Sequence, residues 1–170
     1  ASDVYKRQAV DSAKIIYTAN LTLESKDYET ARSALDSALA EAGGYLESSS
    51  EYTNTDSTRS VSLTLRVPQD SYKSFLAAAA QSGSVTYQNQ QAEDITTRYM
   101  DTEARLASLT AQRTRLQELQ AQADTLADLL EIESRLTDVR YELENRASQL
   151  RLYDNQVDYA TISVSYTHLT

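Results

Sequence analysis

The spacing of apolar residues between about residues 95 and 153 predicts two long helices that fold back on each other. In the second helix the apolar positions step by three and four without a break, the pattern of helices that pack side by side. The first helix repeats this seam more loosely. We therefore predict an antiparallel helical hairpin, packed as a coiled coil, with its tip near residues 121–125. The seam positions are Ile95, Tyr99, Thr102, Leu106, Leu109, Arg113 and Leu116, then Leu129, Ile132, Leu136, Val139, Leu143, Arg146, Leu150 and Tyr153.

Shorter patterns on either side of the hairpin predict strands and two further helices. Alternating apolar and polar residues predict half-buried strands, and apolar residues three to four apart predict helices. Asp27 is the expected N-cap of the first helix, Gly43 and Gly44 end it, and Asn54 to Ser57 form a turn. The expected elements are a strand at 15–23, a helix at 28–42, strands at 45–52 and 61–67, a helix at 72–79, a strand around 85–87 and a last strand around 160–164.

This order predicts an α+β fold, a ferredoxin-like βαββαβ sheet domain with the hairpin inserted before a final C-terminal strand. We expect a sheet platform at residues 9–94, the hairpin at 95–153 and the final strand at 154–165. The hairpin returns the chain to where it left, so the final strand should run antiparallel to the fourth if they pair. The core is expected to hold several tyrosines with their hydroxyls near its rim. These are Tyr17, Tyr45, Tyr72 and Tyr87.

The composition narrows the chemistry that the chain can perform. Its 170 residues carry a formal net charge of −9, which disfavours nucleic acid, because phosphate binding needs clustered Lys and Arg. There is no cysteine, and the only histidine is His168, which leaves no imidazole for a triad elsewhere in the chain. We therefore expect a protein that is not an enzyme, with no catalytic residues, no cofactor and no metal.

The five carboxylates between residues 131 and 144 allow two interpretations. They could hold a metal ion, or they could form ion pairs with arginines four residues away on solvated helix faces. We favour ion pairs. The expected pairs are Glu131 with Arg135, Glu142 with Arg146, and Asp101 with Arg105. Arg113 and Arg146 occupy seam positions, where they either fix the register of the hairpin or dock a partner, and register is the favoured interpretation.

The hairpin tip is the candidate site for binding a partner. Either Asp124 or Thr125 is expected to cap the second helix, with Asp128 completing a variant of the capping box. A tip of this kind presents polar side chains at the end of a long rod. The residues that we expect to contact a partner are Gln120, Gln122, Asp124 and Asp128.

Both ends of the chain have an unusual sequence. Residues 3–8 and 165–170 resemble translated sequencing-adapter read-through from assembled metagenomic data. We therefore predict that residues 1–8 and 165–170 are non-native tails and that the chain is an internal fragment. On this interpretation, a missing signal peptide or membrane anchor says nothing about the whole protein.

Several segments of the chain, in their order and spacing, resemble the bacterial domain of unknown function four-three-four-nine. The resemblance covers roughly residues 14 to 164. It implies an extracytoplasmic protein, either a lipoprotein or one anchored by a transmembrane helix, and it implies no activity. The segments are 14–19 (KIIYTA), 42–48 (AGGYLES), 63–68 (LTLRVP), 92–96 (AEDIT), 129–133 (LLEIE) and 159–162 (YATI), with Tyr99, Asp101, Glu103, Ala104, Arg105 and Leu106.

The sequence is compatible with three hypotheses about function. The leading hypothesis is a non-enzymatic module of the bacterial cell envelope that contacts a protein partner, an envelope component or another copy through the hairpin. The second is a sensor domain that signals to a membrane-linked anti-sigma-type regulator. The third is a domain that binds a small ligand or a glycan with its sheet face and tyrosines. An exposed tyrosine cluster in a pocket would favour this hypothesis, and a closed sheet face would exclude it.

Overall fold

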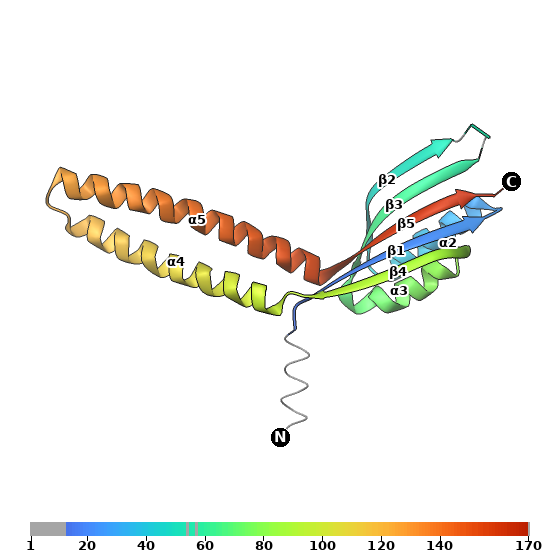
Figure 1. The fold of residues 1–170 in the computed structure, drawn as a ribbon, viewed down its shortest axis with the longest axis horizontal. Coiled ribbons are helices and arrows are strands. Elements are labelled where there is room, and N and C mark those ends of the chain that lie inside the picture. Colours follow the sequence, from blue (N-terminus) through green and yellow to red (C-terminus); the bar gives the residue numbers. More distant parts are fainter. Residues whose placement is uncertain (1–12, 54, 57, 170) are drawn as a thin grey trace, which may run out of the picture. The chain divides into compact units, whose positions relative to one another are not determined.

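The computed structural model describes residues 13–53, 55, 56 and 58–169, and the chain divides into two compact units (Figure 1). Among the described residues, the sheet unit comprises those within 15–94 and 156–169, and the hairpin unit comprises 13–14 and 95–155. The fold is mixed α+β, with a five-stranded mixed sheet.

The elements of the sheet unit follow the predicted order, and the structure extends several of them. Asp27 accepts a hydrogen bond from the Thr30 N–H and so caps the first helix, as predicted. The predicted turn is present at Thr55 and Asp56, whereas Asn54 and Ser57 lie outside the described residues. The elements are β1 (Ile15–Ser25), α2 (Tyr28–Glu41), β2 (Tyr45–Thr53), β3 (Arg59–Pro68), the 3₁₀ turn η1 (Gln69–Ser71), α3 (Tyr72–Ala80), β4 (Ser84–Asp94) and β5 (Tyr159–His168).

The sheet order is β2-β3-β5-β1-β4, which differs from a simple ferredoxin-like sheet because β5 separates β1 from β3. β5 runs parallel to β1 and antiparallel to β3, and β4 pairs with β1 alone. The final strand therefore does not pair with the fourth strand, and the antiparallel pair that was considered for them does not form. A physical reason lies in the two sequences. The inner residues Ala160, Ile162 and Val164 of β5 gain most burial in the middle of a sheet, whereas the Gln-rich β4 suits an edge.

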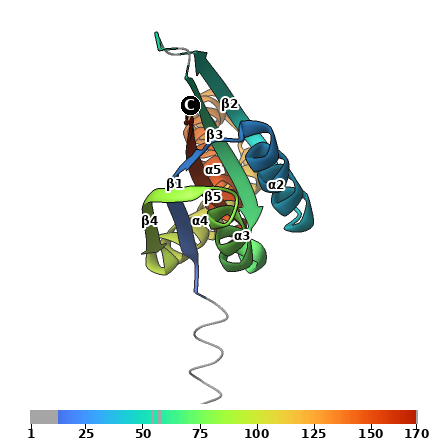
Figure 2. The ribbon, with the colours of Figure 1, turned by 90° about the vertical axis from the view of Figure 1, so that its right-hand side faces the viewer.

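One face of the sheet carries the hydrophobic core. Alternate residues of β3 and β5 point to this face and are buried, as are Leu21 and Leu23 of β1. Helices α2 and α3 cover the same face, with Leu35 and Phe75 in the shared cluster (Figure 2). The opposite face of the sheet is covered by neither helix.

The connection between α2 and β2 depends on two glycines, as predicted. Gly43 has φ +74°, a left-handed conformation that glycine adopts without steric cost. Gly44 lies so close to β3 that an added Cβ would come within 2.6 Å of the Arg66 carbonyl oxygen. Glycine at this position thus lets the end of α2 approach the sheet.

Of the four tyrosines expected in the core, two pack there and two do not, and the Tyr72 hydroxyl is buried instead of lying near the rim as expected. Tyr72 is buried, and Tyr17 stacks on it with ring centroids 5.3 Å apart. Tyr45 is 45% exposed and Tyr87 is 55% exposed, so neither lies in the core. The reason is that β2 and β4 are the edge strands, and these two side chains belong to the face that α2 and α3 do not cover.

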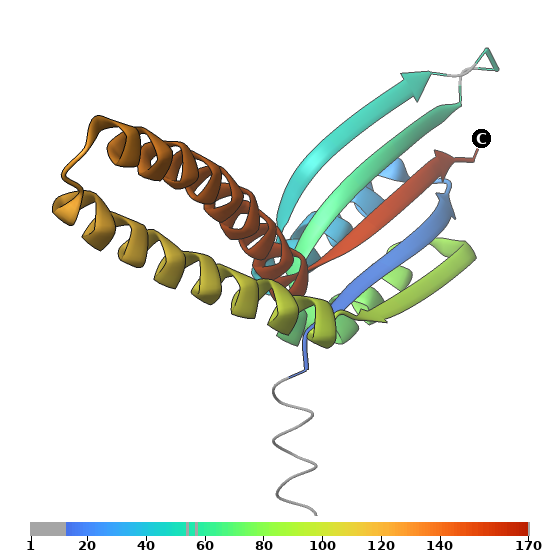
Figure 3. The same ribbon diagram turned by 60° about the vertical axis from the view of Figure 1, so that its left-hand side comes forward.

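The hairpin unit consists of α4 (Thr96–Gln122) and α5 (Leu126–Asp158), which lie side by side (Figure 3). Every predicted seam position is buried or half-buried, and Leu109, Val139 and Leu143 form a cluster between the helices. The Tyr99 hydroxyl donates a 2.6 Å hydrogen bond to Asp154 across the pair. The predicted seam is therefore the packed face of both helices.

One ion-pair prediction is confirmed and two are wrong. Glu131 pairs with Arg135 at 3.1 Å, as expected. Arg105 instead reaches across to Glu142 on the facing helix, with an N–O distance of 2.8 Å. The predicted pairs Asp101–Arg105 and Glu142–Arg146 are accordingly replaced by one pair between the helices, because antiparallel packing brings these side chains closer than their own helix does.

Candidate functional site

The end of the hairpin is a short, well-defined connection. α4 ends at Gln122, and α5 begins at Leu126. Thr125 caps α5, since its hydroxyl accepts a 3.2 Å hydrogen bond from the Asp128 N–H, and its carbonyl accepts the Leu129 N–H at 3.1 Å. This confirms one of the two predicted caps and fixes the geometry of the tip.

Apolar side chains near this tip are left exposed. We call residues 116–134 the distal segment and the remainder of the predicted hairpin, 95–115 and 135–153, the shaft. In the distal segment Leu126 is 72% exposed, Leu130 is 57% exposed and Leu119 is 41% exposed. Fully burying one such side chain contributes roughly 1.5–3 kcal/mol. The segment therefore presents unused apolar surface.

Two neighbouring hollows lie between the helices in this region. The larger, of about 410 Å³, has Leu116, Leu119 and Val139 among its lining residues, and Arg115, Arg135 and Asp138 are polar members of its wall. The second hollow, of about 310 Å³, lies nearer the tip and shares Leu119 with the first. Together they form a groove, which we call the distal groove. The residues of the second hollow are Leu119, Gln122, Ala123, Asp128, Glu131 and Ile132.

The charge of the hairpin changes along its length. The distal segment contains five acidic residues and no Lys or Arg, which gives a formal charge of −5. The shaft contains eight Arg and five acidic residues, which gives +3. Because both parts are helical and solvated, this difference is not demanded by folding. The acids are Glu118, Asp124, Asp128, Glu131 and Glu133.

The four residues predicted to contact a partner are all exposed, but only some of them line the groove. Gln122 and Asp128 form part of its wall, whereas Gln120 and Asp124 lie outside it. The prediction missed the exposed leucines. A signal was present in the sequence, because Leu119, Leu126 and Leu130 are apolar yet fall off the predicted seam.

The carboxylates of α5 do not gather into a metal site in the part of the chain that the structure describes. Within these residues no group of three His, Cys, Asp or Glu side chains is arranged to hold a metal ion. Glu131 and Glu142 are instead engaged with arginines. Arg113 and Arg146 are half-buried at their seam positions, as expected of long side chains that keep their charged ends toward water.

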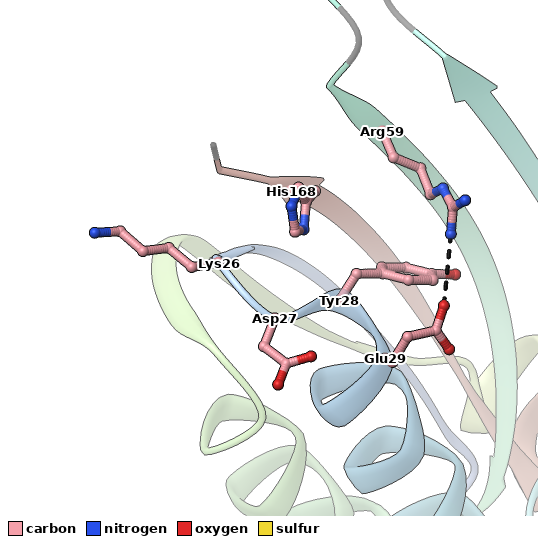
Figure 4. Close-up of a pocket in the computed structure, with 6 residues that line it drawn as sticks. All are labelled: Lys26, Asp27, Tyr28, Glu29, Arg59 and His168. Atoms are coloured by element: carbon pink, nitrogen blue, oxygen red, sulfur yellow. Dashed lines mark ion pairs between the residues drawn. The ribbon is translucent and has the colours of Figure 1, made fainter.

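The sheet unit has a separate pocket of about 330 Å³ at the start of α2 (Figure 4). Arg59 pairs with Glu29 at 3.7 Å, and its guanidinium lies 5.1 Å from the centre of the Tyr28 ring. His168 forms another wall, and it belongs to the predicted non-native tail. The remaining lining residues are Lys26 and Asp27.

Hydrogen bonding shifts the pKa of one group beside this pocket, and burial shifts that of another. The hydroxyl and N–H of Thr30 donate to Asp27 and hold the pKa of its carboxyl below the ordinary value. Burial, assisted by a 3.0 Å hydrogen bond donated to Glu51, raises the pKa of the Tyr28 hydroxyl. Both shifts favour the protonation states that these groups have at neutral pH, an ionised Asp27 carboxylate and a neutral Tyr28 hydroxyl.

Comparison with known protein families gives one match. The model of the family described as Domain of unknown function (DUF4349) matches residues 13–170. The chain belongs to this family. Neither a curated protein nor a solved structure matches the chain significantly. Among the described residues, no helix of this DUF4349 domain has the length and apolar character needed to cross a bilayer.

Proposed function

We propose that this DUF4349 domain is a non-enzymatic interaction module whose hairpin presents its distal segment to a protein partner. The observation that carries the proposal is the combination of exposed leucines with five acidic and no basic residues. A helical pair that served only as a spacer would gain nothing from exposed Leu126 and Leu130. Exposed apolar surface rimmed by polar groups is typical of interaction sites.

The chemistry of the distal groove indicates the kind of partner. Its apolar floor suits one face of an amphipathic helix, which binds by inserting side chains spaced three and four residues apart. Asp128 and Glu131 in the wall of the hollow nearer the tip favour Lys and Arg at that end of the partner helix, whereas Arg115 and Arg135 stand beside the larger hollow. Contact between two distal segments of like charge is disfavoured for the same reason. We therefore expect a basic, amphipathic partner segment in preference to a second copy.

We include two features of the architecture in this proposal, the packing of the hairpin helices and the topology of the sheet. Every seam position is buried or half-buried, which supports antiparallel coiled-coil packing of α4 and α5. The sheet corresponds to a ferredoxin-like arrangement into which β5 has been added between β1 and β3. We further propose that the domain works outside the cytoplasm in a bacterial cell envelope, held by a lipid or a membrane helix in flanking sequence. Its support is the family resemblance, and the complete reading frame tests it.

In-cell photocrosslinking tests the partner-binding claim. A photoreactive benzoylphenylalanine replaces Leu126 in the full-length protein, and the control replaces Tyr141 of the shaft, which is equally exposed at 72%. We expect a discrete adduct from position 126 and none from position 141. The adduct should disappear when Asp124 and Asp128 are changed to Asn. Equal adducts from both positions, or none from either, would contradict the proposal.

A further inference from the structure

The face of the sheet that α2 and α3 leave uncovered has a regular composition. Residues directly opposite each other on paired strands point to the same face, so the registers define rows that cross all five strands. Three consecutive rows make up the middle of this face, which we call the open face. In the order β2, β3, β5, β1, β4 they are Ser50, Ser62, Ser165, Thr22 and Tyr87; Ser48, Thr64, Ser163, Asn20 and Asn89; and Tyr45, Arg66, Thr161, Thr18 and Gln91.

These rows contain hydroxyl and amide side chains almost exclusively. A quarter of the whole chain is charged, at 24%, yet Arg66 is the only charged residue among the three rows. Arg66 is itself buried at 7% exposure and donates a 3.2 Å hydrogen bond to the Tyr159 carbonyl. No aliphatic side chain is present. The accessible open face is therefore uncharged and dense in hydrogen-bond donors and acceptors.

Aromatic rings stand at both edges of this surface. Tyr45 on β2 and Tyr87 on β4 belong to the rows, and Tyr52 extends the β2 side in the next row. All three are exposed. Tyr159 packs edge-on against Tyr45 with ring centroids 5.7 Å apart. A tyrosine offers an apolar ring face and a polar hydroxyl, a combination that suits a ligand with both kinds of surface.

We propose that the open face binds an uncharged, hydroxyl-rich polymer, namely a neutral glycan. Its hydroxyls match the Ser, Thr, Asn and Gln side chains of the rows, and its apolar ring faces match the edge tyrosines. Charge complementarity disfavours the other classes of ligand, namely anionic polymers and basic polypeptide segments. Within the three rows anionic polymers find no accessible cation and basic segments find no carboxylate, and the carboxylates of this face, Glu24 and Glu93, lie in the flanking rows. A second sheet would need interdigitating apolar side chains, which this face lacks.

The site is independent of the distal segment. It lies within the sheet unit, and two of its three rows contain no residue of the predicted non-native tail. Failure of glycan binding would leave the partner proposal intact, and the reverse also holds. The two surfaces differ in kind, since one is acidic and apolar and the other is neutral and polar.

Affinity electrophoresis of the whole chain tests the proposal. The gels contain hydroxyethyl cellulose, mannan or soluble starch, with dextran sulfate as the charged comparison. We expect at least one neutral polymer to retard the protein. The double variant Tyr45→Ala, Tyr87→Ala should weaken retardation about tenfold or more, because both rings lose their stacking contacts with the polymer. Tyr141→Ala, on the shaft, should have no effect.

A second variant separates loss of binding from loss of folding. Asn89→Asp adds a charge to the middle row with almost no change in shape, and Asn145→Asp makes the same change on exposed α5. We expect Asn89→Asp alone to weaken retardation while circular dichroism and Tm stay unchanged. The proposal is overturned if no neutral polymer retards the protein, if dextran sulfate retards it equally, if Asn145→Asp acts like Asn89→Asp, or if the open face instead forms dimers in sedimentation experiments.

Discussion

The inner face of the sheet and the distal segment of the hairpin both carry large aliphatic side chains, which are buried in the first region and exposed in the second. On the inner face, Leu21, Leu65 and Ile162 are buried, because α2 and α3 cover them. In the distal segment, Leu126 and Leu130 remain exposed. An apolar residue of this domain is thus buried only where another element of the chain covers it. Where it does not, the residue is available to another molecule.

The largest effect that bears on this comparison is expected in the shaft. Leu136→Ala removes a fully buried side chain from the seam and should lower the free energy of unfolding by about 2–5 kcal/mol. Leu130→Ala, six residues away and 57% exposed, should change it by less than about 0.5 kcal/mol. Urea unfolding followed by circular dichroism measures both. Similar losses would show that Leu130 is structural.

A smaller effect is expected where the two helices of the hairpin meet. Arg105 and Glu142 are each more than a third exposed, so their 2.8 Å ion pair should contribute only about 0.2–1 kcal/mol. A double-mutant cycle with Arg105→Gln and Glu142→Gln, measured at low and high salt, gives the coupling. A coupling that survives 1 M salt undiminished would argue against this weak, screened pair.

The smallest effect concerns the start of α2 in the sheet unit. The fold lowers the pKa of Asp27 from 3.8, mainly through hydrogen bonds from Thr30. Its stabilisation is therefore fully present above pH 3.8 and is lost as the pH falls through the lowered value. Asp27→Asn retains a capping oxygen but cannot titrate. Its Tm should accordingly fall less than the wild-type Tm between pH 5 and pH 2.

The control for that pH dependence is Asn145→Gln, which exchanges one exposed amide of α5 for another and neither adds nor removes a titrating group. We expect its Tm profile to run parallel to that of the wild type. Parallel profiles for all three proteins would show that capping at Asp27 does not contribute to acid stability.

Local sequence patterns predict the helices and strands well. They are least informative about which strands pair with each other in the sheet. The seam of α4 and α5, the cap at Asp27 and the glycine at residue 43 were all predictable, since each depends on neighbours in sequence. The position of β5 was not, because strand order is decided by which surfaces bury most area together. β4 was predicted only around residues 85–87, because its polar run shows no apolar alternation.

The candidate surfaces were predictable only in part, for a related reason. The tip was located from helix spacing, but the exposed leucines needed the structure to show which face of each helix is packed. Tyr45 and Tyr87 were placed in the core, because their alternation does not reveal which face of the sheet the helices will cover. A residue pattern gives periodicity, and only the tertiary arrangement assigns each face to core or to surface.

Binding of a basic, amphipathic helix to the distal segment is the function that we propose for this domain. Fluorescence anisotropy with a labelled helical peptide of Leu and Lys measures it most directly. Asp124→Asn with Asp128→Asn should weaken binding about tenfold, as should Leu126→Gln with Leu130→Gln. The matched shaft variants are Asp101→Asn with Glu103→Gln, and Leu152→Gln, which alters a leucine 55% exposed; these should bind like the wild type. Equal weakening by shaft and distal variants, or binding unaffected by either, would contradict the account.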